Sequence, residues 1–188
     1  MSDSPAPLHT PGFVSVRKFI HAGQPSSPRL LDLEADPAEE LRMSLPTGTA
    51  VGPALCEVLA RYGQRGGVGR FVGGSAGSLK YHRIEDIDIP HRPYDYGTAF
   101  ALQGQITFVT GGITIGQNEE GKILLHCHAG FINSDGVVHG GHLLLDDVIV
   151  GDDPLIIRLC LFSRSAFVVT RDEETLFSLL HPTPMEPQ

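Results

Sequence analysis

The sequence predicts an α+β fold, a mostly antiparallel β-sheet with one main helix and short flanking helices. One segment has the apolar spacing of an amphipathic helix. It precedes about seven short segments that alternate apolar and polar residues or are apolar throughout. Gly, Asp and Pro turns separate these segments, and the 22 glycines of the chain are typical of β-rich folds. One helix followed by a run of strands indicates an α+β domain.

A chain of 188 residues fits one domain with its own core. We expect flexible tails at residues 1–12 and 182–188 and a single domain over residues 13–181. Hydrophobic residues make up 41% of the chain and charged residues 19%, which are ordinary values for a globular protein and argue against wholesale disorder.

Composition also narrows the location and the partners. The stretch MSDSPAPLHTPG has no apolar run, and no segment approaches the roughly 20 apolar residues that span a bilayer, so no membrane partner is expected. The three cysteines form no CxxC pattern, which indicates reduced thiols and a cytoplasmic location. The net charge is −8 with dispersed Lys and Arg residues, which disfavours nucleic-acid binding unless folding gathers a local basic patch.

The first elements are predicted from short patterns. Residues 13–20 (FVSVRKFI) are predicted to form a strand, residues 21–29 (HAGQPSSPR) a loop, and residues 41–46 (LRMSLP) a half-buried strand.

Residues 51–62 are predicted to form the main helix. Pro53 suits its first turn and Gly63 its C-terminal stop. One apolar stripe follows the helical period and consists of Val51, Leu55, Val58, Leu59 and Tyr62.

After the helix we predict strands and a short final helix at residues 174–180 (ETLFSLL). The strand segments are bounded by turn residues and lie at residues 68–74, 78–84, 99–109, 122–132, 137–145, 155–162 and 166–170.

The glycine-rich stretch at residues 63–78, GQRGGVGRFVGGSAGS, lacks the spacing of a phosphate-binding loop. It contains no GxxxxGK[ST], and residues 70–72 stand where the third glycine of a dinucleotide fingerprint would come. These glycines also follow a helix and surround a strand. We interpret them as residues that let a central strand pack closely against its neighbours.

Four of the nine histidines lie in residues 124–144, LLHCHAGFINSDGVVHGGHLL. His126 and His128 are two residues apart in a predicted strand, so they share one face, while Cys127 points to the other face. Residues 133–136 supply the turn into the next strand. Such a hairpin is either a metal site or a solvated hairpin whose histidines face water or accept ordinary hydrogen bonds.

The length of the loop decides which histidines meet. With a two-residue turn at residues 135–136, His142 pairs with Ala129 and lies on the wrong face. With a three-residue loop at residues 134–136, and a left-handed glycine at its end, His142 pairs with His128.

A bulge at residues 140–141 would make the same one-residue correction. In the three-residue-loop register, His139 pairs with Phe131 and lies on the face of Cys127. We therefore expect His139 to be a bystander.

The predicted metal ligands are His126, His128 and His142. Three neutral imidazoles without a fourth protein ligand are typical of an open Zn²⁺ site that keeps a water. Imidazole also suits Ni, Cu and Fe, so a divalent metal is expected with zinc as the first choice.

The same stretch closely resembles the motif of the plants-and-prokaryotes-conserved (PPC) domain, which has an HxH strand, a short Asp-Gly turn and then Gly-Gly-His-Leu. A strand LRMSLPTG, the helix 51–62, a small-residue strand VGRFVGGSAGSL and a segment FALQGQITF appear in the family's order. The resemblance covers residues 38–170. RKFIHAG and ETLFSLL look like extensions used in one bacterial branch.

The resemblance implies a compact fold around a mostly antiparallel sheet, assembled as a homotrimer, with a metal at His126, His128 and His142. More distantly, that fold is similar to acetolactate decarboxylase and to a zinc-dependent ester hydrolase. Plant members of the family carry AT-hooks and act in transcription, and bacterial members often carry a DNA-binding label.

The chain departs from the family pattern in three places. It has no AT-hook, and residues 98–99 (Thr-Ala) stand where many members have a glutamate before the segment FALQGQI. Asp146 and Asp147 replace small residues after His-Leu-Leu. These two and Asp135 are the local candidates for a general acid or base, and the sequence identifies no catalytic residue.

The resulting hypothesis is a cytoplasmic, homotrimeric metal-binding protein. Its metal would serve a hydrolase or decarboxylase that acts on a small carbonyl compound. The alternative is a DNA-binding or transcription-regulatory interaction module. A third reading is a scaffold in which the metal only staples the hairpin.

Overall fold

A computed structural model describes residues 21–29, 33, 37–63, 66–87, 89 and 94–185 of the chain. The expected tail at 1–12 and strand at 13–20 lie outside the described residues. Residues 21–29 form an irregular loop, as predicted. The helix and strands are, in chain order, β1 (Pro37–Leu45), α1 (Val51–Tyr62), β2 (Gly66–Gly73), β3 (Ser75–His82), β4 (Ile84–Asp86), β5 (Tyr94–Tyr96), β6 (Phe100–Gln117), β7 (Ile123–Ile132), β8 (Val138–Val150), β9 (Leu155–Phe162), β10 (Ser165–Arg171) and β11 (Ser178–Pro184).

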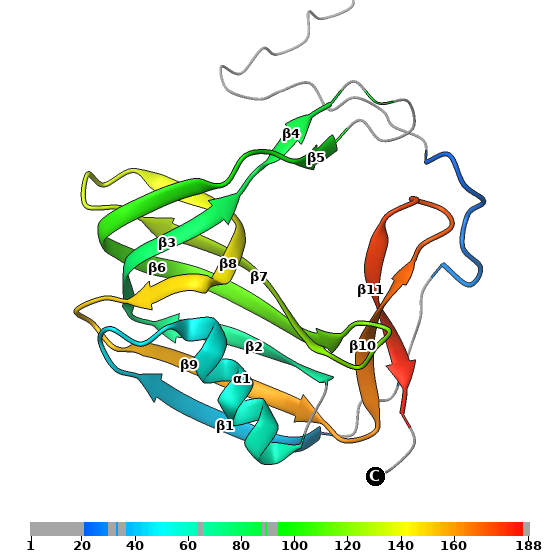
Figure 1. The fold of residues 1–188 in the computed structure, drawn as a ribbon, viewed down its shortest axis with the longest axis horizontal. Coiled ribbons are helices and arrows are strands. Elements are labelled where there is room, and N and C mark those ends of the chain that lie inside the picture. Colours follow the sequence, from blue (N-terminus) through cyan, green and yellow to red (C-terminus); the bar gives the residue numbers. More distant parts are fainter. Residues whose placement is uncertain are drawn as a thin grey trace, which may run out of the picture.

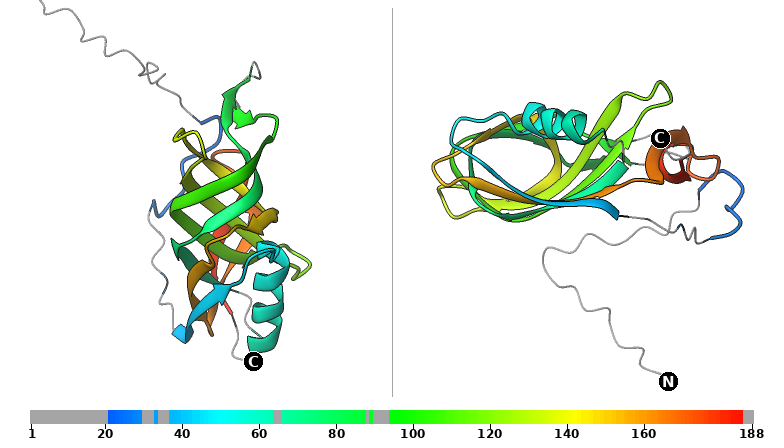
Figure 2. Two further views of the ribbon diagram at one scale, coloured as in Figure 1. Left: turned by 90° about the vertical axis from the view of Figure 1, so that its left-hand side faces the viewer. Right: turned by 90° about the horizontal axis from the view of Figure 1, so that it is seen from below.

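Nine strands form one mainly antiparallel sheet in the order β1-β9-β2-β6-β3-β8-β7, with β10 and β11 attached beside β6. The first part of β6 pairs with β3 and its second part with β7. Because β8 pairs with both β3 and β7, these four strands close into a ring. The strands enclose a flattened oval with α1 along one side (Figures 1 and 2).

The core fills the inside of the curved sheet. In β7, Cys127, Ala129 and Phe131 are buried and alternate with residues that face outward. Helix α1 has the bounds predicted for it and ends at Gly63 with φ 66°. Val51, Leu55 and Leu59 of its apolar stripe are buried in the same core, whereas Tyr62 at the end of the stripe is exposed.

The glycines of β2 allow close strand packing, as interpreted from the sequence. β2 lies between β9 and β6 in the sheet. A Cβ at Gly67 would come within 2.6 Å of the Cys160 carbonyl oxygen, and one at Gly69 within 2.6 Å of a Leu159 methyl carbon. The stretch is therefore a paired central strand, which is not how a phosphate-binding loop is built.

The predicted final helix is wrong. The Asp172 backbone and carboxylate accept hydrogen bonds from the amides of Leu176 and Thr175 (2.8 and 2.7 Å), and Leu176 has φ 63°. These contacts form a tight turn, and the chain continues as β11, which pairs with β10. β11 also runs three residues into the segment expected to be the C-terminal tail. The predicted short flanking helices are therefore not found among the described residues, where α1 is the single helix.

Among the described residues, no helix is long and apolar enough to cross a membrane. The three cysteines are free thiols, and Cys127 is fully buried on the core face of β7, where the sequence placed it.

Candidate metal centre

The loop between β7 and β8 has the three-residue form. The Asn133 amide donates to the Val137 carbonyl (3.1 Å), and the Gly136 amide donates to the Asn133 carbonyl (3.0 Å). Gly136 has φ 77°, the left-handed conformation that glycine adopts readily. The two-residue turn is therefore absent, and the ladder runs past residues 140–141 without a bulge.

This register brings three histidines together. His128 pairs directly with His142, and His126 lies two residues along the same face of β7. One ring nitrogen from each of the three lies within 4.8 Å of the others. The ring centroids are 4.7 Å apart for His126 and His142, 4.8 Å for His126 and His128, and 5.6 Å for His128 and His142.

Proximity and burial disfavour protonation of two of the three histidines. Burial and the neighbouring imidazoles, His126 first among them, lower the pKa of His142 to about 4. Burial and His128 also lower the pKa of His126. At neutral pH both rings are therefore neutral, which is the form of imidazole that binds a metal.

The donor set fits a divalent metal. The Nδ1 atom of His142 is buried and has no hydrogen-bond partner among the described residues, so it is available to bind a metal. In the part of the chain that the structure describes, no side chain or carbonyl hydrogen-bonds to the rings of His126 or His128 either. Three imidazole nitrogens, without a carboxylate or thiolate in the group, match an imidazole-bound metal with an open position.

His139 is a bystander, as predicted. It pairs with Phe131, and its ring stacks on the Phe131 ring at 6.0 Å. Its Nδ1 atom lies 3.0 Å from the Tyr81 hydroxyl. His139 therefore belongs to an internal polar contact on the opposite face from the three-histidine cluster.

The candidate acids have other partners. Asp147 forms an ion pair with Lys80 at 2.7 Å. Asp146 lies against Gly52 at the start of α1, where a negative charge is favourable. Asp135 is exposed in the hairpin loop. None of the three hydrogen-bonds to an imidazole among the described residues.

Two residues that sequence reasoning missed lie beside the cluster. His82 of β3 pairs with His142, and its Nδ1 atom donates to the Gly97 carbonyl (2.7 Å). The ring of Tyr96 lies 4.8 Å from His142 and 5.6 Å from His82. Burial and Asp95 raise the pKa of the Tyr96 hydroxyl. The alternation of residues along β3 predicts that His82 faces outward, but the sequence does not predict that β3 pairs with β8.

A Gly141 side chain would prevent this arrangement. A Cβ there would overlap the carbonyl oxygen of His82. Gly141 thus lets β3 approach β8 closely at the point where His82 meets His142.

His142 also lines a cleft of about 470 Å³ beside α1, β7 and β8. Leu124 and Leu144 supply apolar walls, and Lys122 and Asp146 supply charges of opposite sign. This cleft is large enough for a small molecule to reach the cluster.

No protein-family model matches the chain, and no curated protein matches it. Solved structures do. A PPC protein from Pyrococcus horikoshii has a TM-score of 0.64 at 15% identity, covering 81% of this chain and 97% of that chain. A metal-containing protein from Archaeoglobus fulgidus has a TM-score of 0.65 at 18% identity, covering 81% and 99%. A protein from Ralstonia eutropha JMP134 with a provisional DNA-binding name has a TM-score of 0.60 at 18% identity, covering 74% and 89%. At these identities the likeness is one of fold, and the chain has a PPC-like fold.

Proposed function

We propose that the chain is a metal-binding protein in which His126, His128 and His142 hold one divalent metal, with zinc as the first choice. The observation that carries this proposal is the convergence of three ring nitrogens within 4.8 Å. The metal-containing protein from Archaeoglobus fulgidus, which shares the fold, supports it. The assembly is a homotrimer, as the resemblance to PPC domains implies.

The reaction that suits this site is hydrolysis or decarboxylation of a small carbonyl compound. When bound, the metal supplies Lewis acidity toward a carbonyl oxygen or an activated water. The residues of the chain contribute the cleft, which admits a molecule along Leu124 and Leu144 to His142. Tyr96 and His82 limit the space on the other side of His142.

Metal content tests the site. The protein is purified without an affinity tag that binds metal, dialysed against zinc, and analysed by mass spectrometry for bound metal. We expect one metal per chain, its loss in His128→Ala, and its retention in the matched control His139→Gln. His128 is exposed, so its replacement leaves the core intact. Equal metal content in His128→Ala and the unchanged chain overturns the proposal.

Chelation separates an enzyme from a stapled scaffold. A metal held at a hundredfold excess over its Kd stabilises the native state by about 2.7 kcal/mol. Its removal lowers the melting temperature in both cases. Only an enzyme also loses turnover of small esters or 2-oxo and 2-hydroxy acids, so unchanged turnover contradicts the catalytic part of the proposal alone.

A DNA-binding module is the second candidate. The provisional name of the Ralstonia eutropha protein favours it. Its test is binding to duplex DNA at near-physiological ionic strength, with a steep salt dependence expected from phosphate contacts. Binding that persists in His128→Ala would place DNA recognition outside the histidine site.

A further inference from the structure

Three arginines lie side by side on the outer face of the sheet, far from one another in sequence. Arg42 of β1 pairs with Arg158 of β9, and Arg158 pairs with Arg70 of β2. Directly opposite residues in an antiparallel sheet share a face, with Cβ atoms about 5 Å apart. All three side chains are exposed, and the residues before and after each of them in its strand are buried or half-buried, so the guanidinium groups gather on one surface.

Three permanent positive charges in a row are unfavourable unless something neutralises them. Like charges directly opposite on paired strands destabilise a sheet. Glu40 ion-pairs with Arg158 at 3.4 Å, a long contact between exposed groups that contributes little. Among the described residues, no carboxylate pairs with Arg42 or Arg70. Within the described part of the chain, Arg42 and Arg70 therefore have no carboxylate partner, although the net charge of the chain is −8.

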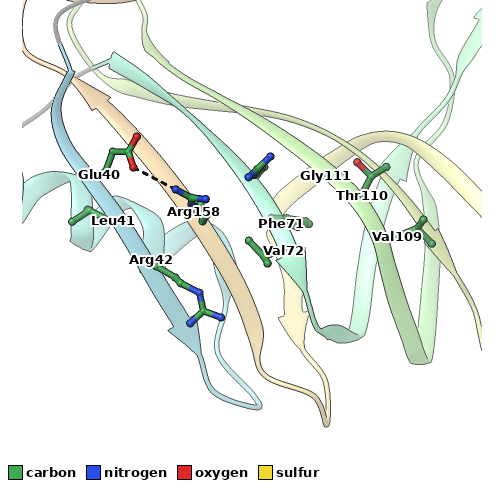
Figure 3. A pocket seen from close by; sticks show the side chains of 10 residues that line it. Glu40, Leu41, Arg42, Phe71, Val72, Val109, Thr110, Gly111 and Arg158 are labelled. Carbon is green, nitrogen blue, oxygen red and sulfur yellow. Dashed lines mark hydrogen bonds and ion pairs between the residues drawn. The ribbon is translucent and has the colours of Figure 1, made fainter.

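The arginines line a cavity of about 620 Å³. It lies where β2 and β6 separate, because the last β2–β6 pair is Arg70 with Gly112. Figure 3 shows Arg158 turned toward Glu40, Arg42 on the neighbouring strand, and Thr110 on the far wall. The Thr110 hydroxyl adds a hydrogen-bond donor on the wall opposite the arginines.

The same cavity has an apolar side. Val72 is 52% exposed and Val109 is 65% exposed, and both line the cavity beside the arginines. Exposed valines next to this row of guanidinium groups suit a molecule with an anionic head and an apolar body. A duplex DNA backbone presents only charge and sugar, and its binding draws on some 6–10 phosphate contacts over a long surface.

We propose that Arg42, Arg70 and Arg158 form a binding site for a small organic anion, a phosphate ester or a carboxylate, whose apolar part lies against Val72 and Val109. Guanidinium groups bind both head groups through paired N–H donors. The proposal is independent of the metal, since none of the three metal-ligand candidates lines this cavity.

Calorimetric titration of the metal-free chain with phenyl phosphate, benzoate and inorganic phosphate tests the site. We expect saturable binding of phenyl phosphate or benzoate, tighter than that of inorganic phosphate. Arg70→Gln weakens it by at least about tenfold, as for the loss of a charged hydrogen-bond pair. The affinity of Arg70→Lys should lie between those of Arg70→Gln and the unchanged chain. The control Arg61→Gln removes the same charge from an exposed position in the last turn of α1, and it should change the affinity by less than about twofold.

Each outcome of these titrations has a different meaning. A preference for phenyl phosphate or for benzoate identifies the preferred head group, and either result supports the site. Retained binding in His128→Ala separates it from the metal centre. The site is overturned if the probes do not saturate, if Arg70→Gln binds as well as the unchanged chain, or if duplex DNA alone binds through Arg70.

Discussion

The histidine centre and the arginine row are two ends of one line of paired residues. Strand pairing joins them on one face of the sheet, through a single glycine, in the order Arg42, Arg158, Arg70, Gly112, His128, His142 and His82. Both ends therefore place like ionisable groups directly opposite on neighbouring strands. The geometry is the same, and only the chemistry of the side chains differs.

That difference decides what each end can bind. Crowded imidazoles release their protons, as the lowered pKa values of His126 and His142 show, and the neutral rings then offer lone pairs to a cation. Guanidinium groups stay charged at any physiological pH, so an anion relieves the repulsion at the arginine end; Glu40 supplies one carboxylate to Arg158, and a bound anion would supply a second. Gly112 separates the two ends without adding a side chain, and nothing lies within 4 Å of where its Cβ would be.

Acid should affect the histidine end most strongly. Because the pKa of His142 falls from 6.5 in the unfolded chain to about 4, the unfolded state binds more protons between these values. The stability of the metal-free chain is therefore full above pH 6.5 and declines as the pH falls toward 4. A difference of one pKa unit is worth about 1.4 kcal/mol when fully expressed, and screening of these half-exposed rings reduces that figure.

Chemical denaturation of the metal-free chain from pH 7.5 to pH 4 measures this decline. His142→Gln should flatten part of the profile, and the double variant His126→Gln/His142→Gln should flatten more. Arg70→Gln should leave its slope unchanged, because a guanidinium does not titrate in this range. An equally steep profile in the double variant would mean that other groups cause the decline.

The hairpin loop should show the next largest effect. Gly136 and Gly48 have similar positive φ values, 77° and 79°, with open space where a Cβ would be. Replacement of either by alanine should lower the free energy of unfolding by about 1 kcal/mol, because both force a side chain into the left-handed region. Only Gly136→Ala should also weaken zinc binding, because only that loop sets the pairing of His142 with His128.

Thermal unfolding and zinc titration of the two variants provide the comparison. Equal zinc affinity in Gly136→Ala and Gly48→Ala would show that the loop conformation does not control the metal site. The arginine cavity should bind phenyl phosphate equally in both, since neither glycine lines it.

The histidine end could be predicted from sequence because its geometry is local. His126 and His128 lie in one strand, and one short loop fixes where His142 falls. The sequence offered a two-residue turn, a three-residue loop or a bulge, and the hydrogen bonds of the loop decide for three residues. The helix was predictable for the same reason, since its stripe and its terminal Gly63 lie within one segment.

The arginine end could not be predicted. Arg42, Arg70 and Arg158 meet only through the strand order β1-β9-β2, which joins segments from opposite ends of the chain. In the sequence these arginines are dispersed, and only the pairing of their strands brings them together as a basic patch. His82 was missed for the same reason. The final helix was mispredicted because a one-turn apolar pattern competed with the hydrogen bonds of the Asp172 turn.

The smallest effect should distinguish the arginine row from ordinary surface charge. In phosphate-free buffer at low ionic strength, Arg70→Gln should raise the free energy of unfolding by on the order of a few tenths of a kcal/mol, because it removes like-charge repulsion from Arg158. The gain should vanish near 1 M salt, where the screening length falls to about 3 Å. The control Arg61→Gln should instead lower stability, because a cation in the last turn of α1 favours the helix. A loss of stability in Arg70→Gln at low salt would mean that the row is already neutralised by acids of the chain, and the reason for an anion to bind there would be gone.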